Sequence, residues 1–143
     1  MIKFNELYLD FKNFIENNSQ YGAKVVKNVT NKTTYFPIVA FTYVNSVNTN
    51  DATVDRIEYY DREYFEITIY AQDKGDISRN IISDELINLT QKYMGDYKNM
   101  YRTGCKPIFN IDESIARTII TYQCQVGNIY GNIIRRWFIY EFK

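Results

Sequence analysis

Residues 64–95 read YFEITIYAQDKGDISRNIISDELINLTQKYMG, and this stretch sets the fold class. Apolar and other side chains alternate over 64–70, which predicts a strand with one buried face. After the polar turn at 72–76, apolar residues recur at three- and four-residue intervals, as they do on one side of a helix. The stretch therefore predicts a strand that is followed directly by an amphipathic helix from Ile77 to Met94.

The two predicted helices have recognisable ends. Asp76 or Ser78 can cap the start of the helix described above, and Gly95 can end it in a left-handed conformation. A second helix is predicted from Phe4 to Asn17, because apolar residues recur there at helical spacing before a polar loop.

Strands are predicted on both sides of these helices, where β-branched and aromatic residues form runs bounded by turn residues. The runs cover 23–26, 36–44, 64–70, 99–109, 114–126 and 130–142. In the run 114–126, one face is mostly apolar and is expected to pack on helices, while the face with Gln123 and Gln125 is expected to be wet or in an interface. This order predicts an α+β fold, an antiparallel β-sheet packed against two α-helices, in a single domain spanning 1–143.

The segment from Thr53 to Ala71 is too long for an average strand, and its two halves differ in polarity. Together with the run before it, we interpret it as a long projecting β-hairpin. Its base at 38–44 and 64–70 is expected to belong to the sheet, and its outer part at 45–62 is expected to extend away from it. The outer part needs a partner to bury its apolar side chains, and the expected subunit interface there consists of Arg56, Ile57, Tyr59 and Tyr60.

Composition and charge argue against several classes of function. The chain has 143 residues, with 17 Lys and Arg against 17 Asp and Glu, and it contains no histidine. Without histidine, it has neither a Ser-His-Asp nor a Cys-His nucleophile and no imidazole metal ligand. A net charge of zero argues against a protein that grips nucleic acid by neutralising phosphates. We therefore expect a protein that is not an enzyme and that uses no cofactor and no metal.

The two thiols and the acidic pairs are the remaining candidates for chemistry. Cys105 and Cys124 fit no metal-binding or redox spacing and are expected to be reduced core residues on neighbouring strands, although a disulfide stays open. Paired carboxylates could support acid–base chemistry, and the pairs are Asp84 with Glu85, Asp112 with Glu113, and Asp73 with Asp76. One pair lies on the polar side of a predicted helix and the others lie in turns, so a solvated surface role is preferred.

The last run combines aromatic residues with Arg135 and Arg136, as single-stranded nucleic-acid platforms do. Neighbouring residues of a strand point to opposite faces, however, which favours packing in a core or an interface. The N-terminus shows no secretion signal, and no window approaches the ~18 apolar residues of a membrane span. The chain is expected to be soluble, to contact no membrane and to be made in a reducing compartment.

The segment from Tyr64 to Val126 is similar to a known family. The resemblance is carried by Ile69 and Tyr70 at the end of a strand, by Ile81, Leu86 and Leu89 in a helix, and by Asn110, Asp112, Ile115 and Arg117 before another strand. In this order the chain resembles the tail terminator, or tail completion, proteins of tailed bacteriophages. Members from phages of Gram-positive hosts show a strand ending in Ile-Tyr, a helix, and an Asn-x-Asp-x-x-Ile-x-Arg-like stretch that enters a strand.

The resemblance implies a structural virion protein. Its copies would form a ring, expected to be a hexamer, that caps the completed tail tube, stops its polymerisation and offers an attachment surface to the head-side neck or connector protein. DNA would pass through the lumen without specific binding, and the protein would lie in the tail or neck of the virion after assembly in the bacterial host cytoplasm. The alternatives are another head–tail connector protein (neck or head-completion), the equivalent part of a phage-tail-like bacteriocin, or, from another class, a small nucleic-acid-binding protein.

Overall fold

A computed structural model describes residues 4–28, 35–49, 60–109, 112–127 and 133–134 of the chain. In this part of the chain, helical and extended elements combine as an α+β fold, which confirms the predicted fold class. In chain order, the elements are α1 (Phe4–Asn18), β1 (Lys24–Lys27), β2 (Ile38–Thr49), β3 (Tyr60–Gln72), α2 (Arg79–Gln91), η1 (Lys92–Tyr97), β4 (Tyr101–Ile108), β5 (Ile115–Gly127) and β6 (Ile133–Ile134).

The strands form one sheet in the order β1-β2-β3-β5-β4, and β6 pairs with the end of β5. Neighbouring strands are antiparallel except for β1 and β2, which run parallel with Lys24 beside Ile38. The prediction of an antiparallel sheet is therefore wrong at this edge. An alternating pattern marks a strand but does not encode its direction, and residues 28–37 are enough chain to return to the start of β1.

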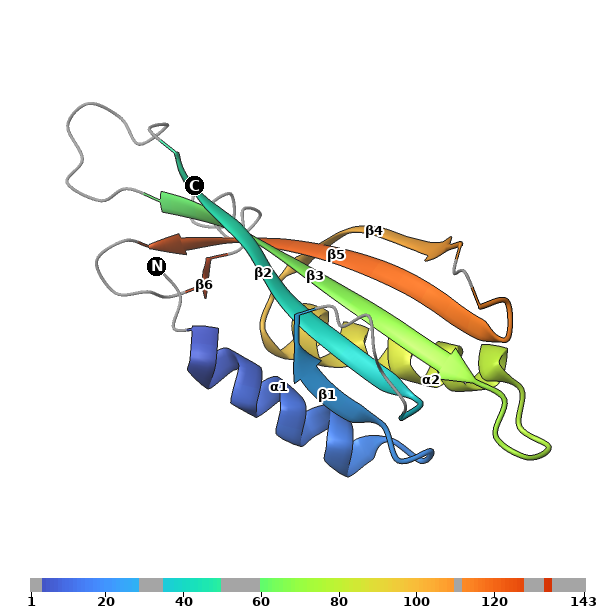
Figure 1. Cartoon of the computed structure of the whole chain (residues 1–143). Coiled ribbons are helices and arrows are strands. Elements are labelled where there is room, and N and C mark those ends of the chain that lie inside the picture. The colour runs from blue at the N-terminus through green and yellow to red at the C-terminus, as the bar shows by residue number, and fades with distance from the viewer. Residues whose placement is uncertain (1–3, 29–34, 50–59, 110–111, 128–132, 135–143) are drawn as a thin grey trace, which may run out of the picture.

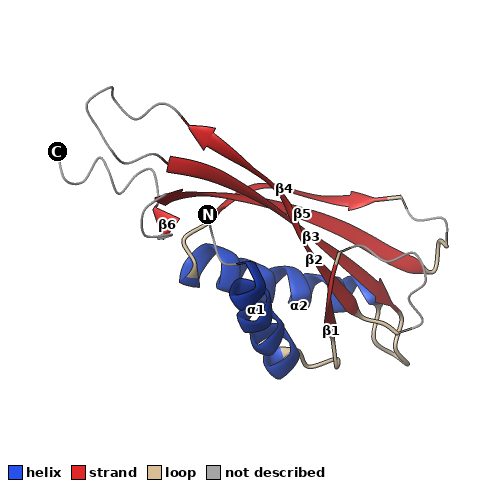
Figure 2. Cartoon of the chain, turned by 60° about the vertical axis from the view of Figure 1, so that its left-hand side comes forward, coloured by secondary structure: helices blue, strands red, loops and turns tan. Residues whose placement is uncertain are grey.

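Both helices pack on the same face of the sheet (Figure 1, Figure 2). Phe41 of β2 lies at the centre of this core, with its ring centroid 4.9 Å from that of Phe11 on α1 and 5.7 Å from that of Phe65 on β3. On α2, Ile82 and Leu86 have no exposed surface. Each large apolar side chain buried in this way stabilises the fold by about 1.5–3 kcal/mol, so the helix-facing side of the sheet holds the two layers together.

The alternation predicted for 114–126 is confirmed in β5. Ile120, Tyr122 and Val126 are buried on the side of the helices. Gln123 and Gln125 are only partly buried and lie on the opposite face, as expected from the period of two. Of the strand predicted over 130–142, Ile133–Ile134 is described as β6, and the rest lies outside the described residues.

The second helix ends differently from the prediction. Ser78 caps its start, because its side chain accepts a hydrogen bond from the Asn80 N–H, as predicted for one of the two candidates. At its other end the chain continues into the π-helical turn η1, which contains Gly95. Gly95 does not have the left-handed conformation that was predicted for it, and a Cβ at this position would require only the end of the Gln91 side chain to move. The positive φ that follows the turn occurs at Asn99.

Candidate interaction surface

The four residues of the predicted subunit interface lie at or beyond the end of the described hairpin. Arg56, Ile57 and Tyr59 lie outside the described residues, and the backbone of Tyr60 begins β3. The pairing of β2 with β3 confirms the hairpin itself, from Ile38 beside Tyr70 to Thr49 beside Tyr60. The structure therefore does not test whether these four residues form a contact.

The predicted outer part of the hairpin begins inside the sheet. Residues 60–64 of β3 pair on one side with 45–49 of β2 and on the other side with 123–127 of β5. β5 thus supports a part of the hairpin that was expected to extend alone, and the prediction that the hairpin projects from residue 45 is not confirmed. Cross-strand partners cannot be read from one strand's pattern, which is why the sequence missed the support from β5.

The sheet face opposite the helices, here called the open face, is covered by no described helix (Figure 2). At one end it is apolar, where Ile38, Ala40 and Tyr70 form a small buried cluster and the Arg117 guanidinium lies 5.5 Å from the centre of the Tyr70 ring. Towards the other end, Arg62 pairs with Gln125 across the two strands, and Tyr64 pairs with Gln123. The open face is thus amphipathic, as interface surfaces commonly are.

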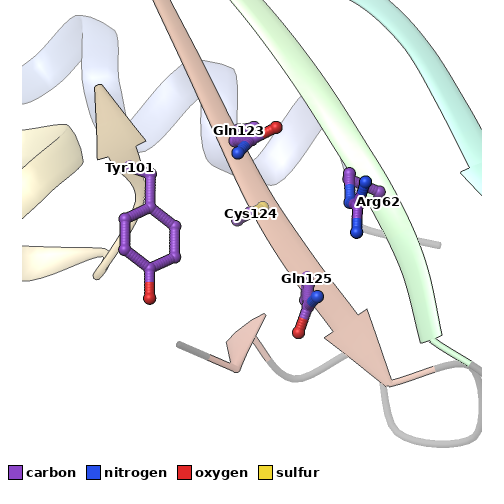
Figure 3. A pocket seen from close by; sticks show the side chains of 5 residues that line it. All are labelled: Arg62, Tyr101, Gln123, Cys124 and Gln125. Atoms are coloured by element: carbon purple, nitrogen blue, oxygen red, sulfur yellow. The ribbon is translucent and has the colours of Figure 1, made fainter. Parts of the chain in front are cut away.

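A shallow hollow lies at the polar end of the open face (Figure 3). It is lined by Arg62 of β3, Tyr101 of β4, and Gln123 and Gln125 of β5, together with Cys124, whose side chain is buried. Its volume is about 100 Å³, well below the ~300–1,000 Å³ of small-molecule sites. A hollow of this size can take one polar side chain from a partner protein but not a typical substrate or cofactor.

Only some of the residues that line this hollow could be predicted from the sequence. The alternation of β5 placed Gln123 and Gln125 on the wet face, and that expectation is confirmed. Arg62 and Tyr101 were missed, because they reach the hollow through the pairing of β5 with β3 and β4. No local pattern in a single sequence reports which residues lie opposite each other in distant strands.

A buried carboxylate lies on the helix-facing side near the same end of the sheet. Glu63 has no exposed surface; its Oε2 accepts a hydrogen bond from the Tyr43 hydroxyl, and its Oε1 has no hydrogen-bond partner among the residues that the structure describes. Burial, and next the contact with Glu63, raise the pKa of Tyr43 to about 12. Burial is also the main cause that raises the pKa of the Cys124 thiol to about 12, with Glu63 as the second cause. Tyr43 and Glu63 thus form a hydrogen-bonded polar pair, and the Cys124 thiol is buried near it on the helix-facing side of the sheet.

One member of each acidic pair accepts hydrogen bonds from a nearby backbone or hydroxyl group. Glu85 accepts hydrogen bonds from the Ser19 hydroxyl and the Gln20 N–H, which ties the end of α1 to α2. Asp73 accepts from the Arg79 N–H at the start of α2. Asp112 accepts from the N–H of Ser114 in the turn before β5. Within the described ranges, no group of three His, Cys, Asp or Glu side chains is arranged to hold a metal ion.

The two cysteines lie on neighbouring strands, as predicted, but only one of them is a core residue. Cys124 of β5 is buried, whereas Cys105 of β4 is exposed, and both are free thiols. The prediction of two core thiols is wrong for Cys105, because β4 is the edge strand of the sheet and does not pack under either helix along most of its length.

Comparison with known proteins gives no family for this chain. No protein-family model and no curated protein matches it in sequence. None of the described helices has the length and apolar character that crossing a membrane requires.

Proposed function

We propose that this protein is a structural component of a phage tail, a terminator whose copies form a ring on the end of the tail tube and offer a surface to the head-side neck. The ring ends polymerisation of the tube protein, and DNA passes through it without specific binding. The protein acts through surfaces between subunits and not through a catalytic centre.

The observation that supports this proposal most is the order of elements where the sequence resembles tail terminators. There, β3 leads through a short turn into α2, and Asp112 stands at the turn from which the chain enters β5. The resemblance calls for a strand, a helix and a further strand that follows the Asn-x-Asp-x-x-Ile-x-Arg-like stretch, and the described elements have this order.

The distribution of surfaces is also suited to a ring. The helices cover one face of the sheet, so the open face, its hollow and the end of the β2–β3 hairpin are left for neighbouring molecules (Figure 1). A subunit that contacts its neighbours through two different surfaces makes heterologous contacts, which close into a ring when the rotation between subunits allows it.

Electron microscopy of tails assembled without this protein tests the proposal. Loss of a terminator should give tail tubes of uncontrolled length, because nothing then stops the addition of tube protein. Tails of normal length that stay unattached to heads would instead identify a neck or head-completion protein and overturn the terminator role.

A double substitution tests the predicted contact at the hairpin. Changing Tyr59 and Tyr60 to Ser should prevent ring formation on tail tubes, because it removes the aromatic side chains expected in the interface. The matched control changes Tyr35, in the chain before β2, and Tyr97, at the end of η1, to Ser; both side chains are exposed and should be dispensable for ring formation. Rings that form normally with the first variant would contradict the contact.

A further inference from the structure

The outer edge of β2 is only partly covered by another strand. β1 pairs with residues Ile38 to Phe41 and ends at Lys27, directly before Asn28, which has a φ of +62°. β2 itself continues to Thr49 and has no outer partner there among the residues that the structure describes. Within the described part of the chain, the backbone N–H and C=O groups on that side thus have no strand partner, and such groups can pair with an added strand.

This edge lacks two of the features by which natural sheets prevent pairing, charged residues and proline. Residues 42–49 read TYVNSVNT, without a charged residue or a proline. Val44 and Val47 are 53% and 44% exposed, so two apolar side chains of the edge face solvent. The ladder shifts its register at Val44 but continues regularly from Asn45 to Thr49, which is a common length for a paired strand.

The opposite edge of the same sheet is protected. β4 carries Arg102, Lys106 and Pro107, its residues are largely exposed, and its ladder shifts register between Arg102 and Gly104. Charges, a proline and a bulge are the usual means of blunting an edge. Because only the β2 edge lacks charges and proline, β2 is the edge suited to accept a strand.

The chain itself contains a suitable strand. Residues 135–143, RRWFIYEFK, lie outside the described residues; they contain no glycine or proline and are rich in aromatic residues, which favour strands. Every second residue from Phe138 to Phe142 is aromatic. We propose that residues 135–143 of one copy add as a strand to Asn45–Thr49 of a second copy.

The position of β6 argues for a second copy as the acceptor. β6 pairs with Gln125 and Val126 on the side of β5 that faces away from β3. To reach the outer edge of β2 in the same copy, the chain after Ile134 must pass β5, β3 and β2, four strand spacings or about 19 Å. Nine extended residues span about 30 Å, so about three would be left for pairing, too few for the five-residue edge.

This contact joins the β5 side of one copy to the β2 side of the next. It is heterologous, and it can close into a ring. The inference rests on the proposed function to the extent that it names the contact between subunits of that ring, but the association itself can be measured without a phage.

The first experiment compares masses in solution by light scattering after gel filtration. The full chain should form a multimer, and a chain ending at Ile134 should be a monomer. In the full chain, Val47→Lys should also give the monomer, because it places a charge on the accepting edge. The control Phe109→Lys makes the same kind of change at a residue that is 78% exposed elsewhere, and it should keep the multimer.

A binding measurement then locates the contact. A labelled peptide of residues 135–143 should bind the chain that ends at Ile134, and Val47→Lys should weaken this binding at least about tenfold relative to Phe109→Lys. A full chain that is monomeric, or a multimer that survives Val47→Lys, would overturn the inference even if the shortened chain failed to fold.

The outcomes separate this inference from the proposed function. If the multimer depends on Val47 but tails made without the protein keep their normal length, the strand contact stands and the terminator role fails. If tails lose length control without the protein but keep it with Val47→Lys, the terminator role stands and the strand contact fails.

Discussion

The two cysteines differ in environment although their strands are neighbours. Cys105 is exposed, while Cys124 is buried and burial raises its pKa to about 12. Because only the thiolate reacts, roughly one Cys124 in ten thousand would be reactive at pH 8 even if reagent could reach it. We predict that a thiol reagent modifies one cysteine per native chain and both cysteines in denaturant. The control Cys105→Ser should show no rapid reaction in the native state, and a rapid reaction of that variant would contradict the placement of Cys124.

Three tyrosines should make the fold sensitive to alkaline pH. Burial is the first cause that raises the pKa of Tyr93 and Tyr122 far above the ordinary value, and it raises the pKa of Tyr43 to about 12. In the unfolded chain these groups ionise near pH 10, whereas in the folded chain they keep their protons to higher pH. The folded state then binds more protons, so its stability is complete below pH 10 and falls as the pH rises above it.

The expected slope is about 1.4 kcal/mol per pH unit for each buried tyrosine that ionises only on unfolding. The measurement is a titration followed by tyrosinate absorbance and circular dichroism together. We expect part of the 14 tyrosines to ionise only as the secondary structure is lost. Ionisation of all of them near pH 10 with an unchanged dichroism spectrum would show that these side chains are not buried.

Among the elements, α1 and η1 are linked by a hydrogen bond from one buried tyrosine. The Tyr93 hydroxyl donates to Asp10 Oδ2 at 2.6 Å, and Lys98 Nζ lies 3.4 Å from the same oxygen. We predict that Tyr93→Phe lowers the free energy of unfolding by about 1–2 kcal/mol, because a hydrogen bond to a charged group is lost. Urea denaturation measures this loss. The control Tyr97→Phe removes a hydroxyl from an exposed ring and should change stability by less than about 0.5 kcal/mol.

The pH dependence of this loss provides a second check. The hydrogen bond from Tyr93 is the main cause that lowers the pKa of Asp10. A lowered pKa stabilises the fold above the unfolded pKa, and the benefit is lost as the pH falls through the folded value. The difference between Tyr93→Phe and the native chain should therefore shrink in acid. A difference that is constant from neutral to acid pH would mean that the hydroxyl acts through packing alone.

Element types were predictable where the period was long and uniform. The first helix and the strand over 114–126 match α1 and β5 closely, because each has a single periodic apolar face. The direction of β1 and the π-helical turn were not predictable. A four-residue strand carries too little pattern to fix its direction, and the apolar spacing up to Met94 does not distinguish a π-helical turn from the end of an α-helix. Of the residues that line the hollow, only Gln123 and Gln125 of β5 could be placed on the open face from the sequence. Arg62 and Tyr101 could not, because their position depends on how β3 and β4 pair with β5.

At the scale of the whole molecule, the equal numbers of acidic and basic residues bear on how the protein meets DNA. With 17 of each, the chain has no net charge to attract phosphates, and tight binding to DNA would need a local patch of basic side chains. A ring through which DNA must travel benefits from a lumen that does not hold phosphate, so we expect few exposed Lys or Arg side chains on the channel wall.

This expectation leads to a binding prediction that separates the two classes of function. Titration of a labelled DNA duplex should show no specific binding at an ionic strength of ~0.15 M, and any binding at low salt should weaken steeply as salt is added. Arg62→Gln and Arg117→Gln on the open face should leave this result unchanged, because those side chains are expected to meet protein. Binding with a dissociation constant below about 1 μM at ~0.15 M salt, lost in these variants, would instead make the open face a nucleic-acid platform, since non-specific binding is typically no tighter than about that value.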